Sequence, residues 1–197
     1  KDLKVDENTL IVFTSDNGTH HEGGADGVVK YKPEYLSTYG PYDGTKRDLW
    51  EGGVRMPTLV RWPSHIKDDS RSTTASQFHD WMPTFCSLAG YHPDRDMKWD
   101  GTDLTELLTN HIPLPQRAIY TAGPRWRASS LRYGDWKLVT HGNGDQRRIE
   151  LFNIANDREE SKNLADEHPD VTPLAEQHVH TRGDLLRSDL DRLKVLR

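Results

Sequence analysis

The sequence has very little cysteine, few long hydrophobic runs and almost no excess of charge, and each shortage excludes a class of protein. Cys86 is the only cysteine in 197 residues, so an internal disulfide is excluded, and the chain is compatible with the cytoplasm or a bacterial periplasm. Hydrophobic residues make up only 34%, and no apolar stretch approaches the length of a membrane span. Charged residues reach 29%, but the net charge is −5, which argues against nucleic-acid binding because that needs a clustered basic excess.

The stretch Thr9–Thr14 predicts a β-strand with polar residues at its end. Its unbroken apolar part, Leu10–Phe13, is typical of a strand that is buried on both faces in a parallel sheet. Ligands of open α/β sheets bind beyond the carboxyl ends of the strands, where Asp16 and Asn17 fall. Their hard oxygen atoms suit Ca²⁺ or Mg²⁺. The alternative is an Asx turn that closes the strand, with Gly18 at positive φ.

Such a strand needs sheet neighbours on each side, and the chain offers few. Only eight residues precede Thr9, and the only similar later run is Met56–Trp62. Two strands cannot form a covered parallel sheet. We therefore expect that a large amino-terminal portion of the fold lies outside this chain.

Further along, the pattern predicts a helix and then a change of fold class. Asp80 as N-cap, Pro83 in the first turn and Gly90 after the last turn delimit an amphipathic helix. Four short strands and a carboxyl-terminal helical region follow. The strands are expected at Ala118–Thr121, Ser129–Tyr133, Trp136–Thr140 and Ile149–Phe152. We therefore expect residues 1–112 to belong to an α/β domain and residues 113–197 to form a small antiparallel sheet with a packed helix.

A second polar segment runs from Gly44 to Pro57 as Gly-Thr-Lys-Arg-Asp-Leu-Trp-Glu-Gly-Gly-Val-Arg-Met-Pro. Lys46 carries a compact charge on a flexible stem, which suits an anionic ester. Gly52-Gly53 permits either positive φ or a close approach of backbones. Glu51 and Arg55 can pair across the turn. The alternative is a charged surface loop whose exposed salt bridge contributes less than about 1 kcal/mol.

Together, Asp-Asn-Gly after a strand and Gly-x-Lys-x-x-x-x-Glu-Gly-Gly-x-Arg-x-Pro closely resemble the type I, formylglycine-dependent sulfatases of the alkaline phosphatase superfamily. The resemblance continues along most of the chain. It includes Asp80–Gly90, Asp100–Leu104, Arg132–Leu138 and Glu150–Ala165. It implies an alkaline-phosphatase-like α/β fold, of which this chain is the carboxyl-terminal part of the central sheet domain plus a small subdomain.

The resemblance also implies roles for individual residues. Asp16 and Asn17 match two calcium ligands, and Lys46 matches the lysine that contacts the sulfate ester. Metal-dependent phosphatases of the superfamily often have Asp-His at this place, where imidazole suits zinc, so Asn17 favours calcium. A divalent cation and a lysine suit the charge that develops in sulfate ester hydrolysis.

Other candidate substrate contacts follow from position. His20 matches a histidine of similar sulfatases and is expected to contact the substrate or to act as a general acid on the leaving oxygen, with His21 beside it. The alternative is that His20 is an ordinary loop histidine, either solvated or capping a backbone group. Arg125, Trp126 and Arg127 suit an anionic sugar ring, and an ordinary strand edge is the alternative.

The catalytic set is incomplete in this chain. The family's nucleophile is a formylglycine made from Cys or Ser in Cys/Ser-x-Pro-Ser-Arg, and no such pentapeptide is present. Cys86 lies in the expected helix, where we interpret it as buried filler. Calcium takes about six to eight oxygen ligands, more than Asp16 and Asn17 supply. We therefore expect Ca²⁺, a formylglycine outside this chain, and the amino-terminal portion of the same sulfatase as its partner.

The expected reaction is hydrolysis of a sulfate ester, of a sulfated carbohydrate or an aryl sulfate, in a bacterial periplasm or outside the cell. Two alternatives stay open. One is a phosphoester or phosphonate hydrolase on the same scaffold. The other is a non-catalytic glycan-binding pseudoenzyme.

Overall fold

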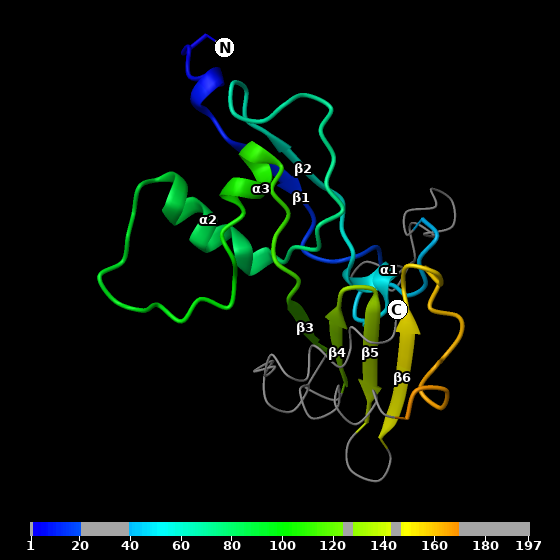
Figure 1. Ribbon diagram of the computed structural model, residues 1–197. Helices are drawn as coiled ribbons and strands as arrows, with labels where there is room; N and C mark the ends of the chain where they lie inside the picture. The colour runs from blue at the N-terminus through cyan, green and yellow to red at the C-terminus, as the bar shows by residue number, and fades with distance from the viewer. Residues whose placement is uncertain (1, 21–39, 124–127, 143–146, 170–197) are drawn as a thin grey trace, which may run out of the picture. The chain divides into compact units, whose positions relative to one another are not determined.

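The computed structural model describes residues 2–20, 40–123, 128–142 and 147–169, which divide into two compact units. The first unit consists of Lys1–Asp16 and Pro57–Pro115. The second consists of Asn17–Met56 and Gln116–Arg197. The second unit thus groups Asn17–Met56 with the carboxyl-terminal sheet. The division into domains at residue 113 stays a prediction. Figure 1 labels the elements along the chain.

The first unit begins with a two-stranded ribbon. After the short 3₁₀ helix η1, Asp6–Asn8, strand β1, Ile11–Thr14, pairs antiparallel with β2, Thr58–Arg61. Phe13 is 68% exposed. A strand buried on both faces in a parallel sheet was expected here. The pairing of β1 with β2 is antiparallel, which differs from that expectation. Burial of both faces was expected to need the amino-terminal portion outside this chain, and it stays a prediction.

The predicted helix is confirmed. The 3₁₀ helix η3, Phe78–Asp80, leads into α2, Trp81–Leu88, with Pro83 in its first turn. Gly90 follows with φ of +68°, a left-handed conformation that suits glycine at a helix end. Asp80 is fully buried and accepts hydrogen bonds from the backbone N–H of Gln77 and Thr102.

Helix α3, Thr105–Asn110, completes the described helices of this unit and packs on α2. The fully buried Thr84 accepts a hydrogen bond from the backbone N–H of Leu104 at 2.8 Å, which ties the two helices together. Cys86 is only partly buried, so the interpretation as buried filler is too strong. Among the described residues, no helix has the length and hydropathy needed to cross a membrane.

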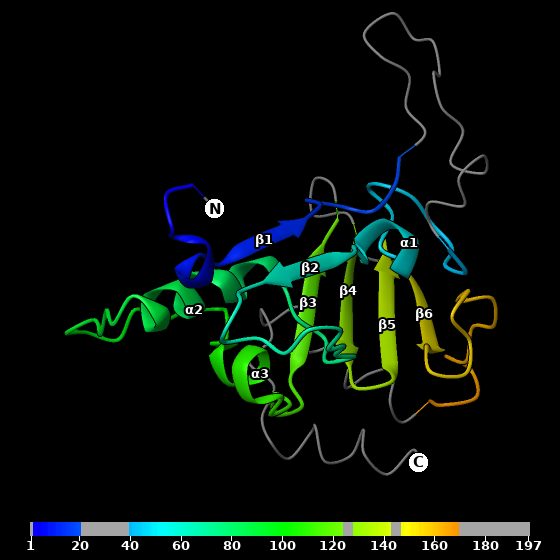
Figure 2. The same ribbon diagram turned by 90° about the horizontal axis from the view of Figure 1, so that it is seen from above.

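The second unit contains a four-stranded antiparallel sheet in which each strand pairs with the next one along the chain (Figure 2). The strands are β3, Ala118–Ala122; β4, Ala128–Tyr133; β5, Trp136–His141; and β6, Arg148–Asn153. All four predicted runs are therefore strands. The sequence stretch expected to form the packed carboxyl-terminal helix falls largely outside the described residues.

The sheet has an apolar cluster on each face, because successive side chains of a strand point to opposite faces. One cluster consists of Leu131, Tyr133, Leu138 and Leu151. The other consists of Leu49, Val139, Phe152 and Ile154. Leu49 comes from the loop before the short helix α1, Glu51–Val54, so this second face of the sheet anchors the segment that contains Lys46.

Candidate functional site

The segment after β1 is held against the loop that carries Lys46. The backbone N–H of Gly18 donates to the Gly53 carbonyl at 2.8 Å, and the N–H of Lys46 donates to the Thr19 carbonyl at 2.6 Å. Asn17 immediately precedes Gly18, the donor of the first hydrogen bond. The structure thus brings the Asn17 segment and the Lys46 loop together, although they lie far apart in the sequence.

Gly18 makes this approach possible by having no side chain. A Cβ added to Gly18 would lie 1.9 Å from the Gly52 carbonyl oxygen, well inside any allowed contact. Positive φ was the alternative role for Gly18, and the glycines with positive φ do not include it. The glycine is needed here for close packing of two backbones.

The Gly52-Gly53 pair closes the Lys46 loop in the same way. A Cβ on Gly52 would lie 2.3 Å from the Gly44 carbonyl oxygen, and one on Gly53 would lie 2.4 Å from that of Asp48. The N–H of Gly52 donates to the Asp43 carbonyl at 2.7 Å. Of the two roles predicted for the pair, close backbone approach is the one that the structure shows.

Glu51 lies at the buried end of this loop and contacts three cations. The residue is only 4% exposed, and Lys137 Nζ lies 3.0 Å from Glu51 Oε1. Arg55 and Arg132 each lie 3.5 Å from Oε2. The predicted pairing of Glu51 with Arg55 is confirmed, and the alternative of an exposed surface salt bridge is wrong for Glu51.

The pKa values of the two carboxyl groups around Lys137 shift in opposite directions. Burial alone would raise the pKa of Glu51, but Lys137, Arg132 and Arg55 outweigh it, and the pKa is lowered. Burial raises the pKa of Glu160, and Lys137 offsets this only in part. Glu51 is therefore the carboxylate that holds its negative charge more firmly, because two arginines face it besides the lysine.

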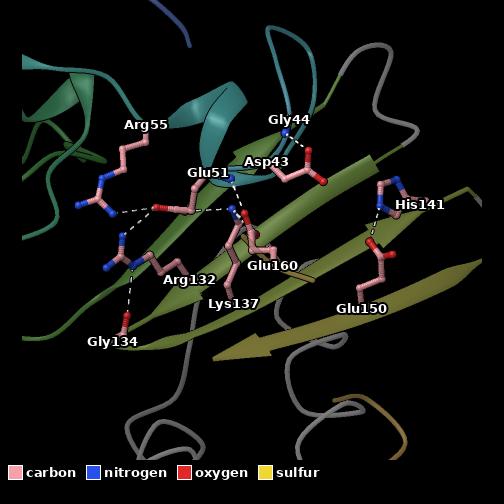
Figure 3. A network of polar contacts seen from close by, with 10 residues as sticks. All are labelled: Asp43, Gly44, Glu51, Arg55, Arg132, Gly134, Lys137, His141, Glu150 and Glu160. Atoms are coloured by element: carbon pink, nitrogen blue, oxygen red, sulfur yellow. Dashed lines mark hydrogen bonds and ion pairs between the residues drawn. The ribbon is translucent and has the colours of Figure 1, made fainter. Parts of the chain in front are cut away.

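Sequence reasoning missed the contribution of Lys137 and Glu160. Lys137 is 1% exposed and Glu160 is 6% exposed, and their charged groups lie 2.9 Å apart (Figure 3). A signal for Lys137 was present, because it precedes Leu138 and Val139 in a predicted strand and a charge there demands a partner. No signal in the turn before Asn163 singled out Glu160 among its charged neighbours.

The remaining candidate residues differ in how far they are exposed, and some of them lie outside the described residues. Asp16 and His20 are exposed, while Asn17 and Lys46 are partly buried. His20 directly follows Thr19, whose carbonyl accepts the Lys46 N–H, so it lies at the same loop junction. The four other candidates lie outside the described residues. They are His21, Arg125, Trp126 and Arg127.

Asp16 and Asn17 fit part of a calcium site by the chemistry of their donors. The Asn17 amide nitrogen donates to the Gly18 carbonyl at 2.8 Å, so this contact uses the nitrogen and not the oxygen that would bind a cation. Among the described residues, no group of three or more His, Cys, Asp or Glu is placed to hold a metal. The pair therefore accounts for a fraction of the roughly six to eight ligands that calcium takes.

The fold that positions these residues is the alkaline-phosphatase-like fold of the sulfatases. The solved structure of Ps i-CgsB in complex with k-i-k-neocarrahexaose matches 91% of this chain and 37% of its own length, with a TM-score of 0.70 and 26% identity. Residues 1–91 match the family model described as Sulfatase.

Similar proteins of known name are also sulfatases. Arylsulfatase G of Mus musculus is 26% identical over 94% of this chain and 39% of its own length. Steryl-sulfatase of Rattus norvegicus is 38% identical over 56% of this chain and 18% of its own length. The chain therefore spans well under half the length of these relatives.

Proposed function

We propose that the complete protein hydrolyses sulfate esters to an alcohol and inorganic sulfate, and that this chain supplies Asp16, Asn17 and Lys46 to its active site. The observation that carries the proposal is the pair of backbone hydrogen bonds that holds the Asn17 segment against the Lys46 loop. The sulfatase family match supports it, because residues 1–91 include all three residues.

The proposed roles follow from the charge of the reaction. A sulfate ester is a monoanion, and negative charge develops on the sulfuryl and leaving oxygens as the ester bond breaks. Lys46 offers an ammonium group with three donors, and its partly buried position strengthens its attraction for those oxygens. Asp16 and Asn17 would hold Ca²⁺, which supplies Lewis-acid stabilisation when bound.

The nucleophile belongs to a part of the protein outside this chain. We place it in the amino-terminal portion, as a formylglycine made from Cys or Ser, because this chain has no Cys/Ser-x-Pro-Ser-Arg. Cys86 is no substitute, since it lies within helix α2 and is not followed by x-Pro-Ser-Arg.

His20 is proposed to contact the substrate or to protonate the leaving oxygen. It directly follows Thr19, whose carbonyl accepts the hydrogen bond from the Lys46 N–H. Four further residues complete the proposed substrate contacts. They are His21, Arg125, Trp126 and Arg127. Their two arginines and one tryptophan suit an anionic ring that can stack.

We propose a sulfated carbohydrate as the substrate. A solved structure with 26% identity was determined with a neocarrahexaose, an oligosaccharide, bound. The names of arylsulfatase G and steryl-sulfatase keep aryl and steroid sulfates as alternative substrates. A polymeric carbohydrate would be met in a bacterial periplasm or outside the cell, which is where we place the protein.

The test is a paired assay of the complete protein with an aryl sulfate and the matching aryl phosphate. We expect sulfate release to be the faster reaction, to fall when calcium is removed with a chelator, and to recover when calcium is added back. Faster phosphate release would support the phosphoester hydrolase instead. Binding of a sulfated glycan with no turnover of either ester would support the pseudoenzyme.

A further inference from the structure

We propose that Lys137 and Glu160 are positioning residues for Lys46, acting through Glu51. This inference rests on the proposed function, because it assigns the two residues to the same site. They are far from Lys46 in the sequence and belong to the carboxyl-terminal sheet and to the turn that follows it. Their contacts all lie within the second unit.

Lys137 joins two carboxylates that would otherwise repel each other. Its Nζ lies 3.0 Å from Glu51 Oε1 and 2.9 Å from Glu160 Oε1. The other oxygen of Glu160 accepts a hydrogen bond from the backbone N–H of Glu51. Glu51 is therefore held at two points, by its side chain and by its backbone. Figure 3 shows the three side chains converging between α1 and the sheet.

Stability alone does not account for such a network. Removing ions from water is costly, and well-packed apolar residues often replace a buried ion pair with no loss of stability. A buried network of this kind instead favours one arrangement of the chain over others. α1 needs such help, because it has only four residues, Glu51–Val54, and the Trp50 side chain does not cap it.

The position of Glu51 determines the geometry of the Lys46 loop through its two glycine neighbours. Gly52 closes the loop with its hydrogen bond to the Asp43 carbonyl. The carbonyl of Gly53 accepts the N–H of Gly18, next to Asn17. A shift of Glu51 therefore moves both the loop that presents Lys46 and the contact that holds the Asn17 segment.

The experiment compares Lys137→Met with Lys162→Met in the complete protein. Lys162 is the matched control, because its Nζ also lies 2.9 Å from a glutamate oxygen, that of Glu167, but its side chain is 67% exposed. We expect Lys137→Met to lower kcat/KM for an aryl sulfate by about 10- to 100-fold, since misplacement by about 1 Å has effects of that size. Lys162→Met should change it by less than about twofold.

Lys46→Ala separates positioning from a general structural role. If Lys137 acts through Lys46, Lys137→Met should lower kcat/KM by a clearly smaller factor in a Lys46→Ala background than in the unaltered protein, and the remaining effect is that of the displaced Asn17 segment. An equal fold-loss in both backgrounds would overturn the proposal. If Lys137→Met does not fold, Glu160→Gln takes its place in the same comparison, because glutamine keeps the shape and removes one buried charge.

Hydrogen exchange distinguishes failure of this inference from failure of the proposed function. The amides of Gly18, Lys46 and Gly52 are the donors that hold the loop. We expect them to exchange at least about tenfold faster in Lys137→Met or Glu160→Gln than in Lys162→Met. This result would support the positioning role even if the protein did not hydrolyse sulfate esters, and unchanged exchange would overturn it.

Discussion

Replacing Lys46 with alanine lowers kcat/KM of the complete protein for an aryl sulfate by about 10- to 150-fold. The change removes a charge-assisted contact to the ester, which contributes about 1.5–3 kcal/mol, and each 1.36 kcal/mol corresponds to a tenfold change in rate. Steady-state kinetics measure the effect. Because the contact strengthens as charge develops on the ester, we expect kcat to fall as well as kcat/KM.

Lys162→Ala is the control for Lys46→Ala. Lys162 lies in the same unit and forms an exposed ion pair with Glu167, so its loss should leave kcat/KM within about twofold. If Lys46→Ala also leaves turnover within about twofold, the role assigned to Lys46 is wrong.

Replacing Gly18 with alanine separates the Asn17 segment from the Lys46 loop. The new Cβ would lie 1.9 Å from the Gly52 carbonyl oxygen, so the backbones must move apart and the hydrogen bond from Gly18 to Gly53 is lost. Overpacking of this kind costs about 1–3 kcal/mol, and displacement of the loop should lower kcat/KM by about 100-fold. Thermal unfolding and kinetics of the complete protein measure the two effects.

Gly90→Ala supplies the control for Gly18→Ala. Gly90 has φ of +68°, but no atom of the described residues lies within 4 Å of an added Cβ. Its replacement should cost about 1–2 kcal/mol of stability from the left-handed backbone alone, with kcat/KM within about twofold. Equal kcat/KM for the two variants would show that the close contact at Gly18 does not hold the site together.

Local patterns in the sequence predicted the local structure well. The four strands between residues 118 and 153 were predictable because short runs of β-forming residues alternate with turn residues. The helix at Trp81–Leu88 was predictable because Pro83 and Gly90 restrict where it can begin and end. These signals depend on residues that are close in the chain.

Features that depend on partners far away in the sequence could not be predicted in the same way. The apolar run before Asp16 indicated a strand, but not that β2 would pair with it antiparallel. Both a positive φ and a close approach of two backbones favour glycine. The Gly52-Gly53 pair therefore could not show which of the two the fold requires. Lys137 contacts Glu51 and Glu160 only in the folded protein, so the sequence alone could not predict its role.

The most direct test of the proposed active site is a crystal structure of the complete protein with a slowly hydrolysed sulfate ester and calcium bound. The account predicts Lys46 Nζ within about 3 Å of a sulfuryl oxygen, and a cation about 2.3–2.6 Å from oxygens of Asp16 and Asn17. An ester bound with Lys46 directed away from it, or a cation held without Asp16 and Asn17, would contradict the account.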